Sequence, residues 1–434
     1  MRTAIFSLML ASMALSFGAH GGDASANAVK VGEESIVMAD GPGKSLRGLP
    51  AVVFGKESYL VVWQEGQVRK GSQASVWAAR VSTDGKLLDA KGIEVANCKN
   101  SLQERPRVAF ASGVFLVVWQ DFRNGQDFDV LGARISPDGR VLDAQPIAIA
   151  IGPRTQVLPD VAADDPASPP GSAAASKGFL VAWQGFQGNE EVCRSFVARV
   201  EQDGKVGQPV ALKVGSNPRI AWNGKEFLAV FTSDGGNSFQ SMRLDADGKP
   251  ARQPGNLISG TTTRFVASVG GVPGKGWLVV MPRSRPDFWG HGGPGAMICQ
   301  SIDTNGKTSV DIPVMPSGNW NRMPNWLDVG DREKKLWPFG VSAVASDGKQ
   351  PVVAWTRWHL GGATGIDFVN GEIMVARVEG WKPVDSDAVA VANSPASESN
   401  PAIASNGAGN LLCVYEKELD DGKAQICART LKTE

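Results

Sequence analysis

One sequence pattern recurs seven times along this chain and constrains its fold more than any other feature. A full copy begins near a proline with a short strand, followed by an apolar strand such as FLVVWQ, a variable segment, a strand ending like Ala-Arg-Val, a turn with Asp-Gly and a last apolar strand; the fifth copy is looser. The copies begin near residues 50, 106, 159, 218, 264, 338 and 401. Four strands per copy are typical of propeller blades. We therefore expect an all-β fold, a seven-bladed β-propeller with four-stranded antiparallel blades.

The second strand of each copy is apolar at consecutive positions rather than at alternate ones. A strand covered on one face alternates, whereas a strand buried on both faces has no need to. The middle strands of stacked blades are covered on both faces. An aromatic residue recurs near the end of this strand, as Trp63, Trp119, Trp183, Trp355 and Tyr415. Its fixed place in the repeat predicts packing between blades rather than stacking against a sugar.

The seventh copy stops after its third strand, and the segment before the first copy matches the missing fourth strand. We therefore expect residues 34–40 to pair beside residues 425–431 and to complete the last blade. Such pairing removes the exposed sheet edges and locks the ring. The expected organisation is a single propeller domain over residues 27–434.

The first residues have the features of an export signal. Arg2 supplies a positive charge, residues 4–17 are apolar, and residues 24–26 (Ala-Ser-Ala) offer a cleavage site. This apolar run is shorter than the roughly 20 residues of a membrane-spanning helix. We expect residues 1–26 to be a signal peptide, and the mature protein to reach the periplasm or the extracellular space without an integral membrane segment.

Charge and cysteine usage exclude several partners. Lys plus Arg (44) equals Asp plus Glu (44), whereas nucleic-acid binders neutralise phosphates with a basic excess, so no nucleic-acid partner is expected. Five irregularly spaced cysteines without CxxC indicate neither a disulfide framework nor a zinc site, and we expect no metal and no cofactor. Cys413 and Cys427 fall on adjacent predicted strands. They either form one disulfide or serve as two small buried side chains. A monomer is expected.

Three long insertions interrupt the repeat, at residues 282–296, 316–337 and 356–370. Blade topology places all three on one face, over the fifth and sixth blades. Aromatic rings beside arginine suit sugar faces and anionic groups, although the same side chains can pack on one another as a self-contained lid. The candidate ligand-binding residues in these insertions are Arg283, Arg285, Trp289, His291, Trp320, Trp326, Arg357, Trp358 and His359.

A second candidate site lies on the propeller axis. The residue after the opening proline sits on the innermost strand, and in the second, third and fourth copies it is Arg107, Asp160 and Arg219. These side chains either bind an anion in the central channel or pair with one another across it. Pairing is the simpler explanation.

Over nearly the whole mature chain the repeats resemble the propeller repeats of secreted bacterial proteins, which implies a fold and little chemistry. The Asp-Gly turns, such as Ser82-Thr83-Asp84-Gly85 and Ser136-Pro137-Asp138-Gly139, are similar to the sialidase Asp-box S-x-D-x-G-x-x-W. In this chain Gly follows Asp directly and no Trp follows, which argues against a sialidase activity. A hairpin turn explains the same residues.

No Ser-His-Asp arrangement, phosphate loop or dinucleotide motif is present, and catalytic residues stay unknown. The leading hypothesis is a binding module that recognises a glycan or protein through the loops of blades five and six. The alternative is a carbohydrate-active enzyme, a polysaccharide lyase or glycoside hydrolase that uses the same face. Some propeller lyases pair His with Tyr, but Tyr59 and Tyr415, the only tyrosines, lie on predicted second strands.

Overall fold

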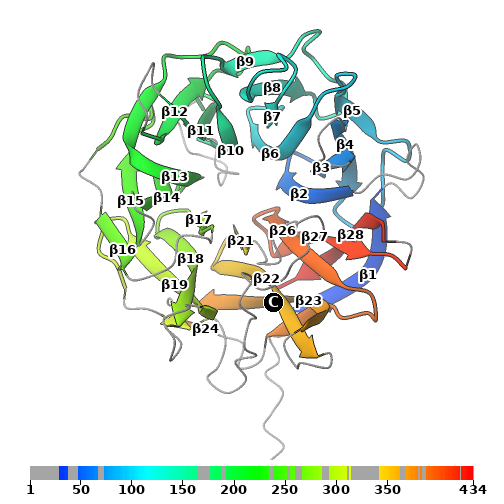
Figure 1. The fold of residues 1–434 in the computed structure, drawn as a ribbon. Coiled ribbons are helices and arrows are strands. Elements are labelled where there is room, and N and C mark those ends of the chain that lie inside the picture. The colour runs from blue at the N-terminus through cyan, green and yellow to red at the C-terminus, as the bar shows by residue number, and fades with distance from the viewer. Residues whose placement is uncertain are drawn as a thin grey trace, which may run out of the picture.

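Antiparallel strands are arranged as seven blades around a central axis in the computed structural model (Figure 1). This confirms the expected all-β propeller. In each blade the strands are called A to D from the axis outward. The residues that the structure describes are 29–37, 47–66, 73–164, 176–186, 192–233, 238–251, 255–259, 266–285, 293–309, 312–313, 342–361, 367–379, 382–383, 388–420 and 422–433.

The strands follow one another in chain order within each blade. Blade one comprises β2 (Arg47–Phe54), β3 (Ser58–Gly66), β4 (Ala74–Ser82) and β5 (Ile93–Ala96). Blade two comprises β6 (Gln103–Ala111), β7 (Val114–Asp121), β8 (Asp129–Ile135) and β9 (Ile147–Ala150). Blades three and four comprise β10 (Val157–Ala163), β11 (Phe179–Gly185), β12 (Arg194–Val200), β13 (Val210–Trp222), β14 (Phe227–Ser233), β15 (Ser238–Leu244) and β16 (Gly255–Ser259).

Blade five comprises β17 (Ser268–Val272), β18 (Gly276–Arg285), β19 (Gly293–Asp303) and β20 (Ile312–Pro313). Blade six comprises β21 (Ala343–Ser346), β22 (Pro351–Gly361), β23 (Asp367–Glu379), β24 (Lys382–Pro383) and β25 (Val389–Ala392), the last of which pairs with β23. Blade seven comprises β26 (Glu398–Ser405), β27 (Asn410–Glu418), β28 (Ala424–Lys432) and β1 (Lys30–Val37).

Strand β13 belongs to two blades. Its first half pairs with β12 as strand D of blade three, and its second half pairs with β14 as strand A of blade four. The two blades therefore share one continuous strand and form a seven-stranded sheet. The sequence copies on either side of Pro218 had suggested two separate strands.

Blade seven is closed by the N-terminal strand, because β1 runs antiparallel to β28 at the outer edge (Figure 1, blue beside red). The described strand begins at Lys30, earlier than the predicted residues 34–40, and residues 38–40 lie outside the described part. Glu34 of β1 accepts hydrogen bonds from the Tyr415 hydroxyl (2.5 Å) and from Lys417 Nζ (2.9 Å). Burial on its own would raise the pKa of Glu34, but these hydrogen bonds outweigh it and hold the pKa below its usual value.

The recurring aromatic residues are buried between blades, as predicted. Trp119 packs with blade-one residues, Trp183 with blade two, Trp355 with blade five and Tyr415 with blade six. Trp63 packs against strands of blade seven across the closure. Each of these side chains is at most 2% exposed. The aromatic of one blade thus fills the space against the blade before it.

The cysteines are free thiols in this structure. Cys413 and Cys427 are buried on neighbouring strands, but Cys413 pairs with Arg429 and Cys427 pairs with Tyr415 in the strand register. Burial raises the pKa of both thiols to about 12. They act as small apolar side chains, which is the second of the two predicted roles.

Adjacent blades are joined by a repeated clasp on the face that carries the B–C hairpins, here called the proline face. In blades one to four and in blade seven, the residue before the opening proline has a left-handed backbone, with φ between 51° and 55°, which non-glycine residues seldom adopt. Its N–H donates to the side chain that ends strand B of the preceding blade. The pairs are Arg105 with Gln64 (3.2 Å), Leu158 with Gln120 (3.2 Å), Asn217 with Gln184 (3.1 Å) and Leu49 with Glu416.

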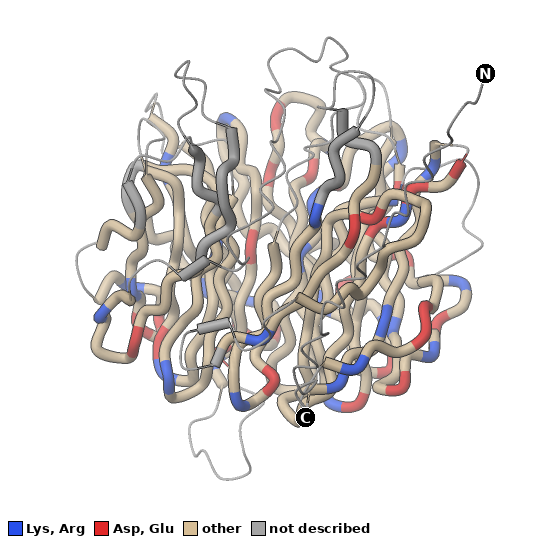
Figure 2. Tube along the Cα trace, turned by 90° about the horizontal axis from the view of Figure 1, so that it is seen from below, with Lys and Arg blue, Asp and Glu red and all other residues tan. Residues whose placement is uncertain are grey.

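A second set of contacts joins blades on the opposite face, here called the turn face. The arginine of the Ala-Arg-Val pattern donates to a backbone oxygen in the Asp-Gly turn of the next blade: Arg80 to Pro137 (3.2 Å), Arg134 to Gln202 (3.0 Å) and Arg243 to Thr304 (2.7 Å). Viewed across the axis, Lys, Arg, Asp and Glu gather along this edge of the ring (Figure 2). The Asp-Gly turns are thus hairpin turns that also connect blades.

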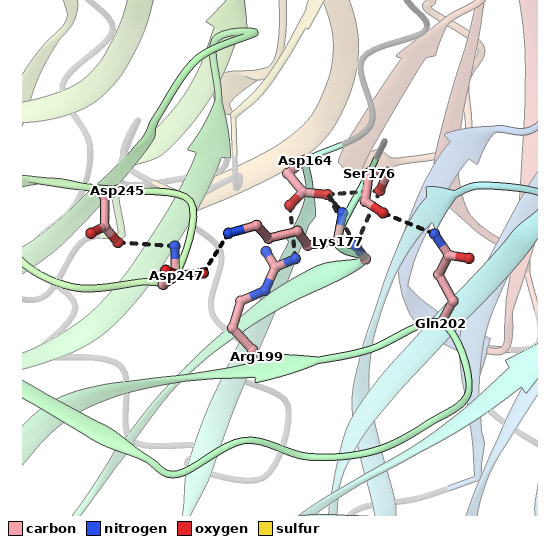
Figure 3. A network of polar contacts seen from close by, with 8 residues as sticks. Asp164, Ser176, Lys177, Arg199, Gln202, Asp245 and Asp247 are labelled. Carbon is pink, nitrogen blue, oxygen red and sulfur yellow. Dashed lines mark hydrogen bonds and ion pairs between the residues drawn. The ribbon is translucent and has the colours of Figure 1, made fainter. Parts of the chain in front are cut away.

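In blade three the same role falls to a carboxylate network around Asp164 (Figure 3). Asp164 is 8% exposed and accepts hydrogen bonds from Arg199 Nη2 (2.7 Å), Ser176 Oγ (2.7 Å) and the Gly178 N–H (3.0 Å). Lys177 beside it reaches Asp247 of blade four (2.8 Å). The network fixes the A–B turn of blade three against its neighbour.

Replacing Asp164 with alanine is expected to lower the free energy of unfolding by about 3 kcal/mol, because Arg199 keeps its buried charge and loses its carboxylate partner. Asp247→Ala is the matched control. Its ion pair with Lys177 is more than half exposed and is worth about 0.5 kcal/mol. Chemical denaturation of both variants measures the difference, and equal stabilities would contradict the role of Asp164.

Candidate functional site

The innermost strands β2, β6, β10, β13, β17, β21 and β26 contact one another in turn around the axis. On each of them, one residue pairs with the position just before the recurring aromatic of strand B. We call it the axial position. From blade one to blade seven it is held by Ala51, Arg107, Asp160, Arg219, Ser268, Ala343 and Ala402.

The axial position is charged in three consecutive blades and small in the other four. Arg107, Asp160 and Arg219 come from blades two, three and four, and the remaining residues are alanine or serine. In blade five, Ser268 is engaged with its neighbour, since its hydroxyl donates to the Ser342 backbone oxygen. One side of the axis is therefore lined by long charged side chains and the other by short neutral ones.

The two axial arginines are held in the same way. In each, Nη1 donates to the backbone oxygen of the proline before it, at 2.9 Å for Arg107 and 2.9 Å for Arg219. Asp160 lies between them: its Oδ1 is 3.8 Å from Arg107 Nε, and its Oδ2 accepts the Ile220 N–H at 2.9 Å. The side chains of Arg107 and Asp160 are 19% and 13% exposed, so both keep some access to water.

Arg105 is a third cation of this cluster, and the sequence analysis did not identify it. It precedes Pro106 in the left-handed position that Leu49, Leu158 and Asn217 hold in other blades. Its charge acts on both Arg107 and Arg219. Since blades two and four are not neighbours, this electrostatic effect acts across the axis rather than along one blade junction.

Two carboxylates act on the three cations of the cluster: Asp160 on Arg107 and Arg219, and Glu104 on Arg105. Burial, together with the charges of Arg219 and Arg105, lowers the pKa of Arg107 to about 10 against the opposing effect of Asp160. The pKa of Arg219 is lowered by burial and raised in part by Asp160. A guanidinium stays protonated in proteins. The lowered pKa values of Arg107 and Arg219 therefore indicate that both cations are poorly compensated, and an added negative charge would stabilise them.

Most of the loop residues predicted from the sequence cannot be placed. Trp289, His291, Trp320 and Trp326 lie outside the described residues. Arg283, Arg285, Trp358 and His359 lie on β18 and β22, where the structure describes the backbone and not the side chains.

Arg357 is described, and its Nε donates to Glu372 Oε2 (2.9 Å) on the neighbouring strand β23. Its side chain is 40% exposed. This ion pair lies within the hairpin and leaves Arg357 near the surface.

The B–C hairpins of blades five and six extend farther on the proline face than the hairpin of blade two. Pairing in β7–β8 of blade two ends at Asp121 opposite Asp129. Pairing continues to Arg285 opposite Gly293 in blade five, and to Gly361 opposite Asp367 in blade six. Counted from the axial position, both hairpins reach farther beyond the blade. The extended hairpins therefore lie at the proline-face end of the ring, while the axial residues Arg107, Asp160 and Arg219 lie midway along their strands.

The two tyrosines are structural. Tyr59 donates to the Asn410 backbone oxygen (3.0 Å) and Tyr415 donates to Glu34, and both are 0% exposed. Burial raises the pKa of each hydroxyl above its usual value. Neither can act as an acid on an external substrate without opening the blade interface.

Among the described residues, no three His, Cys, Asp or Glu side chains are placed to hold a metal ion. In the same part of the chain, no helix has the length and apolar character needed to cross a membrane.

No protein-family model and no curated protein matches the sequence. Among solved structures, a protein of unknown function from Dyadobacter fermentans is similar, with 8% identity and a TM-score of 0.47 over 94% of this chain and 99% of that one. Trypanosoma rangeli sialidase is similar with 10% identity and a TM-score of 0.46 over 91% of this chain, which spans 59% of the sialidase.

A subtype N11 neuraminidase-like protein of A/flat-faced bat/Peru is also similar, with 10% identity and a TM-score of 0.45 over 94% of both chains. All three TM-scores are below 0.5. The assignment of this chain as a β-propeller rests on its strand order and its closure, not on these likenesses.

Proposed function

We propose that this chain is an exported binding propeller that takes an anionic saccharide at the proline-face end of its axis. Arg107 and Arg219, with Arg105 beside them, contact a carboxylate or sulfate group of the ligand. The observation that carries the proposal is the unequal charge of the axial cluster, where Asp160 alone stands between two arginines from non-adjacent blades.

The geometry of the arginines supports an anion as the ligand. Each arginine donates from Nη1 to a neutral backbone oxygen. A guanidinium has five N–H donors, so further donors are left to contact an anion. Planar carboxylate and sulfate groups match this donor fork and form charge-assisted hydrogen bonds. Asp160 is held by the Ile220 N–H, so the spacing of the cations on either side of it is set by the fold.

Two further features support a saccharide. The small axial side chains Ala51, Ala343 and Ala402 occupy less space than an arginine would and favour a ligand beside the cations. The extended hairpins of blades five and six lead into sequence that is rich in tryptophan, which is suited to stacking on sugar rings. We propose that these loops also contact the ligand.

Calorimetric titration with acidic oligosaccharides and their neutral counterparts tests this function. We expect binding of carboxylated or sulfated sugars that weakens with salt, and a loss of at least about tenfold in affinity for Arg107→Gln/Arg219→Gln, at about 1.5 to 3 kcal/mol per charged hydrogen bond. Arg140→Gln is the matched control, because Arg140 is exposed on the turn face and pairs with Asp138 (2.7 Å). Affinity unchanged in the double variant would contradict the axial site.

Assays for cleavage products of the same sugars distinguish binding from catalysis. Reducing ends or unsaturated uronates produced from the ligand, and lost in His291→Ala or His359→Ala, would favour the enzyme hypothesis. Export is tested separately, by N-terminal sequencing of secreted protein, which is expected to begin at Asn27.

A further inference from the structure

The side chain that ends strand B differs in one of the four observed clasps. Gln64, Gln120 and Gln184 accept the N–H of the left-handed residue in the next blade. In blade seven the equivalent residue is Glu416, which accepts the Leu49 N–H of blade one. A carboxyl group therefore replaces the amide at the junction between the last blade and the first.

Glu416 is half-buried at this junction, with the backbone of both blades close to its carboxyl group. In the strand register it lies opposite Ser399 of β26 and Ile426 of β28, and Asn400 donates a hydrogen bond to it. Its Oε1 lies 3.0 Å from the place that a Cβ would take on Gly48, so the backbone of β2 passes against the carboxyl group. A side chain at position 48 would displace it.

The charged groups on the surrounding elements are directed elsewhere. Those of β2, β26, β27 and β28 pair as follows: Arg47 with Glu65 (3.5 Å), Glu398 with Ser394, Lys417 with Glu34 (2.9 Å), and Arg429 with the Gly32 backbone oxygen (3.2 Å). Among the residues that the structure describes, no cation acts on Glu416, and burial raises its pKa to about 7 against the opposing effect of hydrogen bonds from Leu49 and Asn400.

We propose that Glu416 is a proton-dependent clasp, which holds blades seven and one together as a neutral acid and loosens that junction when it ionises. A protonated carboxyl has the shape of the glutamine amide and offers the same acceptor oxygen. The ionised form places a charge between two blades without a cation to compensate it, which is costly. The clasp is independent of the axial ligand site.

The direction of the pH effect follows from the change on folding. The pKa of Glu416 is higher in the folded chain, about 7, than the value of 4.5 of an unperturbed glutamate. The folded state therefore holds the proton more tightly than the unfolded state. The stability that Glu416 contributes is fully present below about pH 4.5 and is lost as pH rises through 7.

Glu416→Gln tests the proposal, because glutamine is the residue that the fold already accepts at this position in other blades. At pH 5 we expect equal unfolding midpoints for the variant and the wild type, and at pH 8.5 a midpoint higher by about 3 °C in the variant. In hydrogen exchange, a peptide covering residues 47–54 is expected to lose protection in the wild type between about pH 4.5 and 7, about tenfold per unit after correction for intrinsic rates, and to reach a plateau above pH 7, whereas the variant keeps its protection.

Gln184→Glu is the matched control, since it moves the same carboxyl group to the clasp between blades three and four. It is expected to add a loss of stability between pH 5 and 8.5 and to reduce protection near Asn217 rather than near Leu49. Parallel pH profiles for the wild type and Glu416→Gln would overturn the proposal. Ligand affinity at pH 5 tests the axial site separately. If the wild type and Glu416→Gln bind the ligand equally at that pH, failure of the clasp proposal does not contradict the axial site.

Discussion

Removing residues 29–37 is expected to lower the free energy of unfolding by at least about 4 kcal/mol and to end cooperative unfolding of the ring. Strand β1 is paired with β28 at six positions, from Lys30 opposite Lys432 to Val37 opposite Ile426. Each hydrogen bond contributes about 1 kcal/mol net, and burial of Val37, which is 1% exposed, contributes about 2 kcal/mol. Without β1, blade seven keeps three strands and exposes β28 as an edge.

Thermal and denaturant unfolding measure this effect. A synthetic peptide of residues 29–37 is expected to restore part of the lost stability in proportion to its concentration, because it binds the folded state alone. Ile36→Ser, at a side chain that is 40% exposed, is the control and is expected to change stability by less than about 0.5 kcal/mol. A deletion variant that unfolds like the full chain would contradict the closure.

Trp119→Ala is expected to cost about 4 kcal/mol, since it removes a fully buried indole from the interface of blades one and two. It also removes the hydrogen bond from Trp119 Nε1 to Asp121 Oδ2 (2.8 Å), and Asp121 is 0% exposed. Trp119→Phe keeps most of the apolar volume and loses the donor, and we expect it to cost about half as much.

Leu142→Ala, in the same blade but 40% exposed, should change stability by less than about 1 kcal/mol. Denaturant midpoints of the three variants rank the effects. A Trp119→Ala variant that unfolds like the wild type would contradict packing as the role of the recurring aromatic, and a matching loss of sugar binding would favour a ligand contact instead.

Features repeated in every blade were predictable from the sequence, because the same physical requirement acts on each copy. The Trp residues fall between blades since two sheets must cover strand B on both faces. The closure follows from a copy that ends one strand early. Strand β13 was not predictable as a single element, since nothing in the sequence from Val210 to Trp222 shows that strands of two blades join without a turn.

The candidate site was predictable only in part, because it depends on which departures from the repeat meet in space. Arg107, Asp160 and Arg219 share a repeat position, so they were found. Arg105 and Glu416 occupy positions that hold different residue types in other blades, and their roles emerge only from contacts across blade junctions. The predicted residues of the long insertions stay predictions.

The register of β1 against β28 also has a mechanical consequence. Lys30 lies opposite Lys432, so the outward ends of the two strands are at the same end of the blade. Tension applied between residues 30 and 432 would load the antiparallel ladder one bond at a time, as in a zipper, instead of shearing all its bonds together. Under such tension the ring would open first at this ladder, at low force, while blades one to six keep their hydrogen bonds.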